Sequence, residues 1–307
     1  MTRRVTRRGL LVVAAASLAP FETRAAITLV EVAPGIHVRQ GVHEEATVEN
    51  QDAIANIGFI VGDRSVAVID PGGSLADGEA LRAGLRRVTD KPISHVIFTH
   101  LHPDHVFGAV AFADDRPHFV GHARMLPMLV SRGEFYRNRL ADVLGIEPAG
   151  DYDKPDLLVD DTQALDLGDR ELQLRAWPTA HTDNDLTVFD KRTATLWAGD
   201  LLFVDRVPAL DGSIVGWLKV IDLLREIPAR RAVPGHGPAS VAFPAALAPE
   251  QRYLSLLARD IRAAIGHGGS IEAAVDTIGQ SERGRWALFD DYNGRNVTAA
   301  FKELEWE

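Results

Sequence analysis

The stretch Ile93-Ser-His-Val-Ile-Phe-Thr-His-Leu-His-Pro-Asp-His105 decides the fold of this chain. Its first half, residues 93–98, is a short apolar run that predicts a buried strand. Its second half holds three histidines and a carboxylate within six positions. A solvated polar loop with incidental histidines is the alternative, but so many potential ligands directly after a buried strand favour a metal site.

The spacing within this motif predicts more than one metal ion. Alternation along an extended chain places His100 and His102 on the same side. Pro103 then turns the chain, so that Asp104 and His105 face a neighbouring point. One segment therefore supplies ligands to two adjacent metals.

Outward from the motif, the chain shows two rounds of short strands followed by a helix. A strand alternates or runs apolar for four to eight residues, whereas a helix repeats its apolar positions every three or four residues. The first round has strands at 36–39, 57–61 and 66–69 and a helical stripe at Leu81, Leu85 and Val88; the second has strands at 172–176, 186–189 and 195–197 and a stripe at Trp217, Val220, Ile221 and Leu224. This order predicts an α/β protein, a four-layer αββα sandwich of two mixed β-sheets with helices on both outer faces.

No linker separates the two rounds. Residues 150–160 are only weakly enriched in linker residues, and the polar, proline-broken region 122–156 predicts one or two helices that cap the core. Helices near 249–265 and 294–304 close the chain. We therefore expect residues 26–307 to form one domain, with its C-terminal helices starting at about residue 245.

Residues 1–25 have the layout of a signal peptide. Arginine pairs, of which Arg7-Arg8 best matches a twin-arginine signal, precede an uncharged apolar run from Leu10 to Ala19. That run is too short for a bilayer, which needs about 20 apolar residues. A basic helix on a cytoplasmic protein is the alternative. We expect export to the periplasm by the twin-arginine route.

Charge and composition exclude several classes of partner. The chain of 307 residues has 33 Lys and Arg against 43 Asp and Glu, a net charge of −10, and no cysteine. The acidic balance disfavours nucleic acid, no segment predicts a stable membrane span, and a small-molecule substrate is the partner that remains. Without cysteine, any metal must be held by histidine and carboxylate.

Three further residues follow predicted strands. His181 comes after the strand at 172–176, Asp200 after the one at 195–197, and His236 after a short strand at Ala232-Val233. Loops at the ends of the strands of a sandwich gather along one edge and often carry function. We expect these three residues to join the histidine motif there.

At this point the sequence resembles the metallo-β-lactamase superfamily of hydrolases. The His-x-His-x-Asp-His motif, the later His181, Gly199-Asp200 and Gly235-His-Gly237 occur in the family's order between about residues 30 and 240. The resemblance implies two zinc ions per chain: one bound by His100, His102 and His181, the other by Asp104, His105 and His236, with Asp200 bridging them. It also implies that Asp70, in the first family motif, supports the metal loop without binding metal itself, although a simple turn aspartate before Pro-Gly is the alternative.

Two details narrow the resemblance. Lactamases with a cysteine ligand have it where Asp200 stands, so this chain favours the branch of hydroxyacylglutathione hydrolases and lactonases. The stretches 43–47, 180–186 and 286–292 look like the exported zinc metallohydrolases associated with quinoprotein relay and sulfur-oxidation systems.

The resulting functional prediction is a dinuclear zinc hydrolase that cleaves an ester, thioester or lactone by a metal-bound hydroxide. Asp104, or a metal-bound water, would return a proton to the leaving group. A mononuclear iron oxygenase acting on sulfur compounds and a β-lactamase-like hydrolase are the alternatives, and a non-catalytic metal site ranks below them. The physiological substrate and the oligomeric state stay open.

Overall fold

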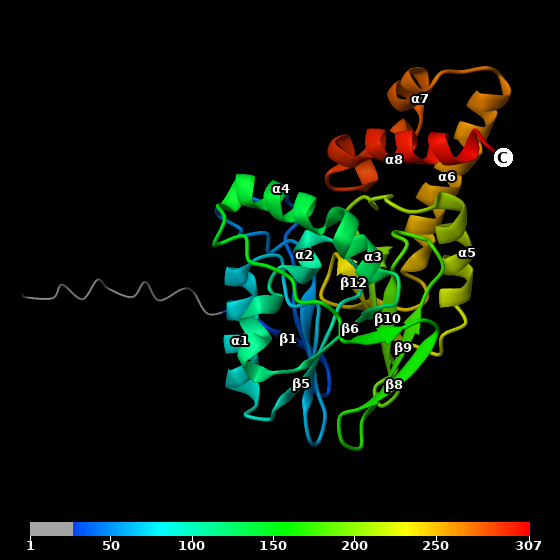
Figure 1. Ribbon diagram of the computed structural model, residues 1–307. Helices are drawn as coiled ribbons and strands as arrows, with labels where there is room; N and C mark the ends of the chain where they lie inside the picture. Colours follow the sequence, from blue (N-terminus) through cyan, green and yellow to red (C-terminus); the bar gives the residue numbers. More distant parts are fainter. Residues whose placement is uncertain (1–26) are drawn as a thin grey trace, which may run out of the picture.

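The computed structural model describes residues 27–307, and the predicted signal peptide therefore lies outside the described residues. Two β-sheets pack face to face, with helices on their outer sides (Figure 1). In the described part of the chain, no helix is both long enough and apolar enough to cross a membrane.

The first sheet has seven strands in sequential order. They are β1 (Val30–Ala33), β2 (Ile36–Arg39), β3 (Ile57–Val61), β4 (Val66–Ile69), β5 (Ile93–Ile97), β6 (His118–His122) and β7 (Leu157–Val159). Strands β1 to β4 pair antiparallel, whereas β4 to β7 pair parallel. The sheet is therefore mixed, as predicted.

The second sheet has six strands in the spatial order β13-β12-β11-β10-β9-β8. They are β8 (Thr162–Asp166), β9 (Glu171–Ala176), β10 (Leu186–Asp190), β11 (Thr195–Phe203), β12 (Arg231–His236) and β13 (Val241–Ala242). Only β11 and β12 pair parallel, because α5 (Ile214–Leu224) crosses over between them.

Three apolar clusters fill the spaces between the four layers. The middle cluster lies between the sheets and includes Ile69 of the first sheet and Leu174 of the second. A second cluster joins the first sheet to α1 (Leu75–Val88) and the 3-10 helix η1 (Ala109–Asp115). A third joins β11 to α5 and the C-terminal helices. The structure confirms the predicted αββα layering.

Two groups of helices stand above one end of the sandwich. The first is α3 (Met125–Met128), a π-helical turn η2 (Leu129–Gly133) and α4 (Glu134–Leu144). The second is α6 (Leu247–Gly266), α7 (Ile271–Thr277), the 3-10 helix η3 (Gln280–Arg285) and α8 (Phe289–Leu304), which project to the upper right in Figure 1. The first group was expected as a cap on the core and the second as the helices that close the chain, and residues of both line the same cleft.

Candidate metal centre and substrate cleft

The histidine motif lies in the loop that follows β5, at the end of the first sheet. The motif is not extended throughout, because Pro103 begins a four-residue helix, α2 (Pro103–Val106). Proline fits the first position of a helix, where its missing N–H is not needed. The resulting turn separates His102 from Asp104 and His105.

The second sheet supplies the remaining residues from three places. His181 lies in the loop after β9, as expected. Asp200 and His236 were expected just beyond strands, but they lie inside β11 and at the end of β12. The short apolar run around Trp197 concealed the true length of β11, which continues to Phe203 and is buried throughout. The strand is irregular at this point, because Gly199 has a φ of +54° and the pairing with β12 shifts register on both sides of Gly199. Asp200 therefore stands next to a bulge in β11.

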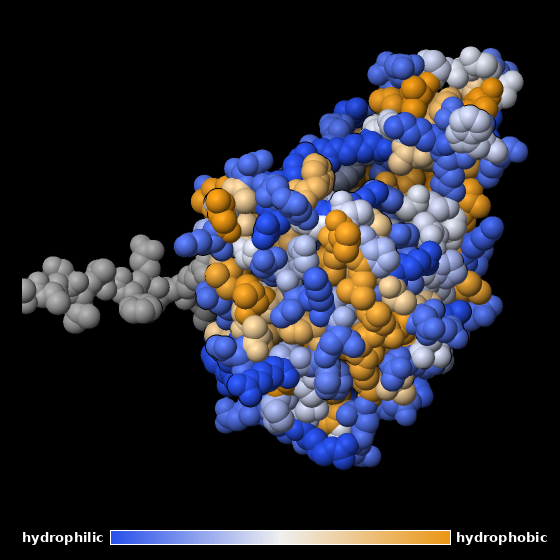
Figure 2. Space-filling view, in the orientation of Figure 1, coloured by the Kyte–Doolittle hydropathy of each residue, from blue (hydrophilic) through white to orange (hydrophobic). Residues whose placement is uncertain are grey.

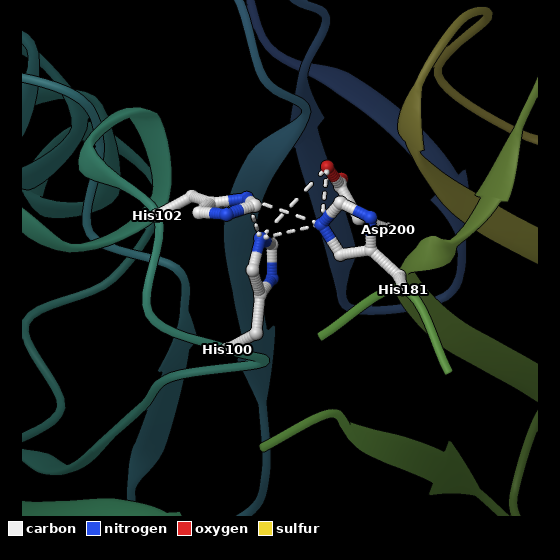
Figure 3. Close-up of side chains that lie close together, drawn as sticks. All are labelled: His100, His102, His181 and Asp200. Carbon is white, nitrogen blue, oxygen red and sulfur yellow. Dashed lines mark hydrogen bonds and ion pairs between the residues drawn. The ribbon is translucent and has the colours of Figure 1, made fainter. Parts of the chain in front are cut away.

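The structure brings His100, His102, His181 and Asp200 together, with side chains pointing at a common centre (Figure 3). His100 Nε2 lies 3.0 Å from His102 Nδ1 and 3.3 Å from His181 Nε2. His181 Nε2 lies 3.1 Å from His102 Nδ1. Nitrogens bound to a tetrahedral zinc at about 2.0–2.1 Å lie about 3.4 Å apart. The spacing of the three nitrogens therefore fits a zinc ion.

A second group, Asp104, His105 and His236, lies beside the first. Asp104 Oδ2 is 3.3 Å from His236 Nε2 and 3.5 Å from His105 Nε2. Asp200 faces both groups, since its Oδ1 is 3.2 Å from His105 Nε2 and its Oδ2 is 3.4 Å from His181 Nε2. This carboxylate occupies the position that a bridge between two cations requires.

Each of the five histidines places its other ring nitrogen near an oxygen. His181 Nδ1 lies 2.6 Å from the carbonyl oxygen of Ala209, and His236 Nδ1 lies 3.0 Å from that of Ile54. The corresponding oxygens for His100, His102 and His105 are Thr99 Oγ1 at 3.1 Å, Asp211 Oδ2 at 3.3 Å and Asp70 Oδ2 at 2.8 Å. Such outer bonds fix the ring orientation of metal-binding histidines. The inner nitrogens are then free to bind a cation.

Two buried polar atoms in the centre lack a hydrogen bond: His105 Nε2 and Asp200 Oδ1. A buried polar atom without a partner costs about 1–3 kcal/mol. Both residues are almost fully buried. The donor set, its spacing and these two atoms all fit bound metal ions, with nitrogen and oxygen ligands of the kind zinc prefers.

The pKa values differ between the two groups of histidines. Burial holds the pKa of His100 well below its usual value and lowers that of His181 to about 4. Burial also acts to lower the pKa of His105, but the surrounding Asp200, Asp104 and Asp70 outweigh it and raise that pKa well above its usual value. Conversely, burial acts to raise the pKa of Asp200, but the neighbouring His236, His105 and His100 hold it well below its usual value. The carboxylate is therefore ionised at neutral pH.

Asp70 lies behind the second group and contacts only its outer side. Its Oδ1 accepts a hydrogen bond from Thr99 N at 2.8 Å, and its Oδ2 accepts one from Thr99 Oγ1 at 2.8 Å. Together with its contact to His105 Nδ1, this ties the metal loop to the end of β4. These contacts are those that a supporting residue would make, and the role itself stays a prediction.

Close packing within the second sheet and hydrogen bonds between the two sheets hold the centre together. A Cβ on Gly235 would lie 1.8 Å from Asp200 Oδ1, so only glycine fits there. Leu101 N donates to Asn184 Oδ1 at 2.8 Å, which joins the metal loop to the loop that carries His181. Asn56, directly before β3, donates from Nδ2 to the carbonyl oxygen of Pro234 at 2.9 Å. This bond joins the start of β3 to β12.

Asp211 is a functional residue that the sequence analysis missed. Its Oδ2 accepts a hydrogen bond from Arg132 Nη1 at 2.6 Å and lies beside His102 Nε2. These contacts lower its pKa to about 2, although burial opposes the change. Asp211 stands in a turn with no periodic pattern, and only the folded chain brings it to His102.

A cleft of about 800 Å³ opens over the centre, between η2 and α4 on one side and α8 on the other. Figure 2 shows the surface hollowed below the C-terminal helices. The cleft combines acidic, basic and aromatic side chains. Its lining includes Asp104, Asp200, Arg132, Phe135, Tyr136, Arg206, Tyr292, Arg295 and Asn296.

Comparison with known proteins agrees with this geometry. The family model of the metallo-β-lactamase superfamily matches residues 51–236, more than half of the chain. The chain therefore belongs to that superfamily, whose fold and metal-dependent hydrolase chemistry agree with the two sheets and the histidine and aspartate cluster.

Among individual proteins, the similarities are more distant. A linear primary-alkylsulfatase of Pseudomonas sp. (strain ATCC 19151) is 32% identical over 67 residues, which is 22% of this chain and 13% of that protein. A stereoselective inverting sec-alkylsulfatase from Pseudomonas sp. superposes with a TM-score of 0.68 at 16% identity, over 90% of this chain and 50% of that one. The chain thus spans half the length of that alkylsulfatase. A metallo-β-lactamase from Pontibacter korlensis superposes with a TM-score of 0.60 at 17% identity, over 74% of this chain and 98% of that one.

Proposed function

We propose that this protein is a dinuclear zinc hydrolase that cleaves an ester, thioester or lactone. The observation that carries the proposal is the position of Asp200, whose two carboxylate oxygens face the two groups of ligand atoms. His100, His102 and His181 would hold one zinc, and Asp104, His105 and His236 the other. A closed structural zinc site needs neither a second ion beside it nor an open cleft.

Zinc ions at such a site lower the pKa of bound water from about 15.7 to about 7 and so supply a hydroxide nucleophile at neutral pH. The chain needs no serine or cysteine nucleophile for this chemistry. Two of its ligand candidates, Asp104 and Asp200, line the cleft, so that a nucleophile held there would be reached by substrate.

Asp104 is the residue that would handle the proton. Burial acts to raise its pKa, but His105 and His236 outweigh burial and lower the pKa below the usual value. Asp104 is therefore ionised at neutral pH and would take the remaining proton of the hydroxide once the hydroxide has attacked. It returns that proton to the leaving group, and thiolates and alkoxides of low basicity need little such help.

The walls of the cleft orient the substrate and exclude water. Tyr136 stands beside His102, with their ring centres 5.9 Å apart, and Phe135 lines the same cleft. Aromatic side chains of this kind bind the apolar part of a substrate.

Metal analysis combined with a substrate panel tests the proposal. Purified protein loaded with zinc is expected to contain two zinc ions per chain and to hydrolyse esters, thioesters or lactones. One iron per chain together with oxygen consumption would instead identify the sulfur-compound oxygenase. Turnover of β-lactams far above every ester, thioester and lactone would show the assignment to be wrong.

An alkyl sulfate ester is a second candidate substrate. The guanidinium groups of Arg132, Arg206 and Arg295 line the cleft and suit a sulfate group, and two of the similar proteins are alkylsulfatases. The panel therefore includes alkyl sulfates, with release of inorganic sulfate as the measured product.

Export in the folded state belongs to the same proposal. The arginine pairs and the short apolar run in residues 1–25 support it. Fractionation of cells expressing the full chain should recover it in the periplasm without that segment. Recovery of uncleaved protein in the cytoplasm of healthy cells would refute export.

A further inference from the structure

Helix α8 forms one wall of the cleft and lies beyond the region that the family model matches, which ends at residue 236. Tyr292, Arg295 and Asn296 line the cleft from this helix. Residues three and four apart share one face of a helix. One turn of α8 is therefore directed toward the cleft.

Hydrogen bonds fix α8 in this position. Asn296 Nδ2 donates to the carbonyl oxygen of Pro208 at 2.6 Å, and Asn296 Oδ1 accepts from Leu210 N at 2.9 Å. Between these two residues lies Ala209, whose carbonyl oxygen is the outer partner of His181. One short segment thus holds both α8 and a candidate metal ligand, so the helix is positioned with respect to the centre.

Two arginines meet at one tyrosine on this wall. The guanidinium carbon of Arg295 lies 5.1 Å from the centre of the Tyr292 ring, and that of Arg206 lies 5.5 Å from it. Arg206 is 3% exposed and contacts Tyr292 Oη at 3.2 Å and Glu45 Oε1 at 3.5 Å. Within the described residues, Arg295 contacts no carboxylate and donates no hydrogen bond. The wall therefore carries two cations against one carboxylate, in a chain of net charge −10.

The cleft has a second arm along α4, in which apolar side chains stand beside the charged Glu45, Asp52 and Arg139. A cavity of about 390 Å³ shares Asp104, Phe135 and Tyr136 with the cleft and continues along α4 to Leu140 and Val143. Phe135 is 58% exposed and Val143 41%, which is high for apolar side chains. The two arms meet at Asp104, where the proposed reaction takes place.

We propose that the substrate is an anionic amphiphile: Arg295, which stands beside Tyr292, binds its carboxylate or sulfate group against α8, and its apolar chain lies along α4. This inference rests on the proposed hydrolase function and names the substrate class of that site. Arginine suits these planar or tetrahedral oxyanions because its guanidinium group can donate two parallel hydrogen bonds. Arg206 is already partly engaged with Glu45, which leaves Arg295 as the group free to bind the anion.

The test measures binding and hydrolysis separately. Octanoate, octyl sulfate and neutral octanol, each below its micelle concentration, are titrated into zinc-loaded protein by calorimetry and used as inhibitors of neutral ester hydrolysis. The variants are Arg295→Ala and Arg295→Gln, with Lys302→Ala as control, since it removes one positive charge from an exposed position on the same helix. Circular dichroism checks that each variant folds.

Both Arg295 variants should weaken binding of the two anions relative to octanol by about tenfold, or ~1.4 kcal/mol, while Lys302→Ala leaves these ratios unchanged. The anion that loses more affinity identifies the substrate group as carboxylate or sulfate. Equal effects on octanol and the anions, or no effect on any probe, would overturn the inference. If the wild type binds the anions through Arg295 but hydrolyses no ester of the panel, the subsite stands and the proposed reaction fails.

Discussion

Asp200 is the residue on which both halves of the metal centre depend. Two cations about 3.5–4 Å apart repel each other, and a carboxylate between them offsets that repulsion. We expect Asp200→Ala to bind at most one zinc and to lose hydrolysis by at least about 100-fold, while the sandwich persists. Metal analysis, turnover and circular dichroism check these three points.

The control for this variant is Asp222→Ala, since Asp222 is exposed on α5 and pairs only with nearby polar side chains. Two zinc ions per chain with normal turnover in Asp200→Ala would rule out the bridging role.

Asp211 is not one of the ligand candidates, and it acts on the metal centre through its contact with His102. Loss of an outer partner of a metal-binding histidine typically reduces metal affinity by about 10–100-fold. We expect Asp211→Ala to weaken zinc binding within that range, because His102 loses its partner at Nε2. Competition with a chromophoric chelator measures the affinity. An unchanged affinity would mean that Asp211 serves only to hold Arg132.

At the scale of elements, the close parallel pairing of β11 and β12 leaves no space for a side chain at Gly235. A methyl group there would lie 1.8 Å from Asp200 Oδ1 and must displace it. We therefore expect Gly235→Ala to lose zinc and activity much as Asp200→Ala does. Gly266, at the end of α6, provides the matched control Gly266→Ala, because a methyl group added there would meet no atom within 4 Å. Normal zinc content in Gly235→Ala would contradict the close packing.

The contact between α6 and β11 predicts a dependence of stability on pH. Glu250 on α6 is fully buried, accepts a hydrogen bond from Phe203 N at 2.9 Å through Oε1, and has no partner for Oε2. Burial raises the pKa of Glu250 well above its usual value. The folded chain therefore keeps this proton at pH values where the unfolded chain has lost it, and the stabilisation declines as pH rises from the usual carboxyl pKa to the raised one.

Glu250→Gln keeps the acceptor and removes the titration. Relative to this variant, the free energy of unfolding of the wild type should fall by up to about 1.4 kcal/mol per pH unit across that window. Urea unfolding of both proteins at a series of pH values measures the difference. A difference that stays constant with pH would show that Glu250 has an ordinary pKa.

Most of the elements could be predicted from the sequence, because their apolar patterns are strong. The strands β2, β3 and β4 were predicted with their observed bounds, and α5 and α6 within a few residues. The strands β1, β6, β7, β8 and β13 were missed; all have five residues or fewer, and their neighbours in the sheet define them more than their own residues do. Helix α2 is too short to show a period.

The residues of the candidate site also fall into two groups, those that the sequence predicted and those that it did not. The seven ligand candidates stand in motifs of fixed spacing, and the structure brings all of them together. Asp211, Arg206 and Arg295 belong to no motif, and they reach the cleft only because distant segments fold over it. Sequence patterns therefore indicated the metal chemistry but gave no information about the walls that select the substrate.

For the whole molecule, the metal ions are expected to add stability. A ligand that binds only the folded state stabilises it by about 2.7 kcal/mol at 100 times its dissociation constant. In a domain of this size, chelation of zinc should lower Tm by at least about 5 °C, and added zinc should restore it. Differential scanning calorimetry with and without EDTA measures the change, and Asp200→Ala should respond much less. A Tm unaffected by EDTA in the wild type would contradict the site.

The origin of the ligands in both sheets also has a kinetic meaning. His100, His102 and His105 come from the first sheet, whereas Asp200 and His236 belong to the last strands of the second. Contacts between segments so far apart in the chain form late in folding, because closing the intervening loop costs entropy first. A partly folded chain therefore has no complete binding site, and uptake of zinc becomes the event that reports that both sheets have docked. Stopped-flow refolding with a zinc indicator should accordingly show metal binding after the burial of tryptophan, as the final phase of the reaction.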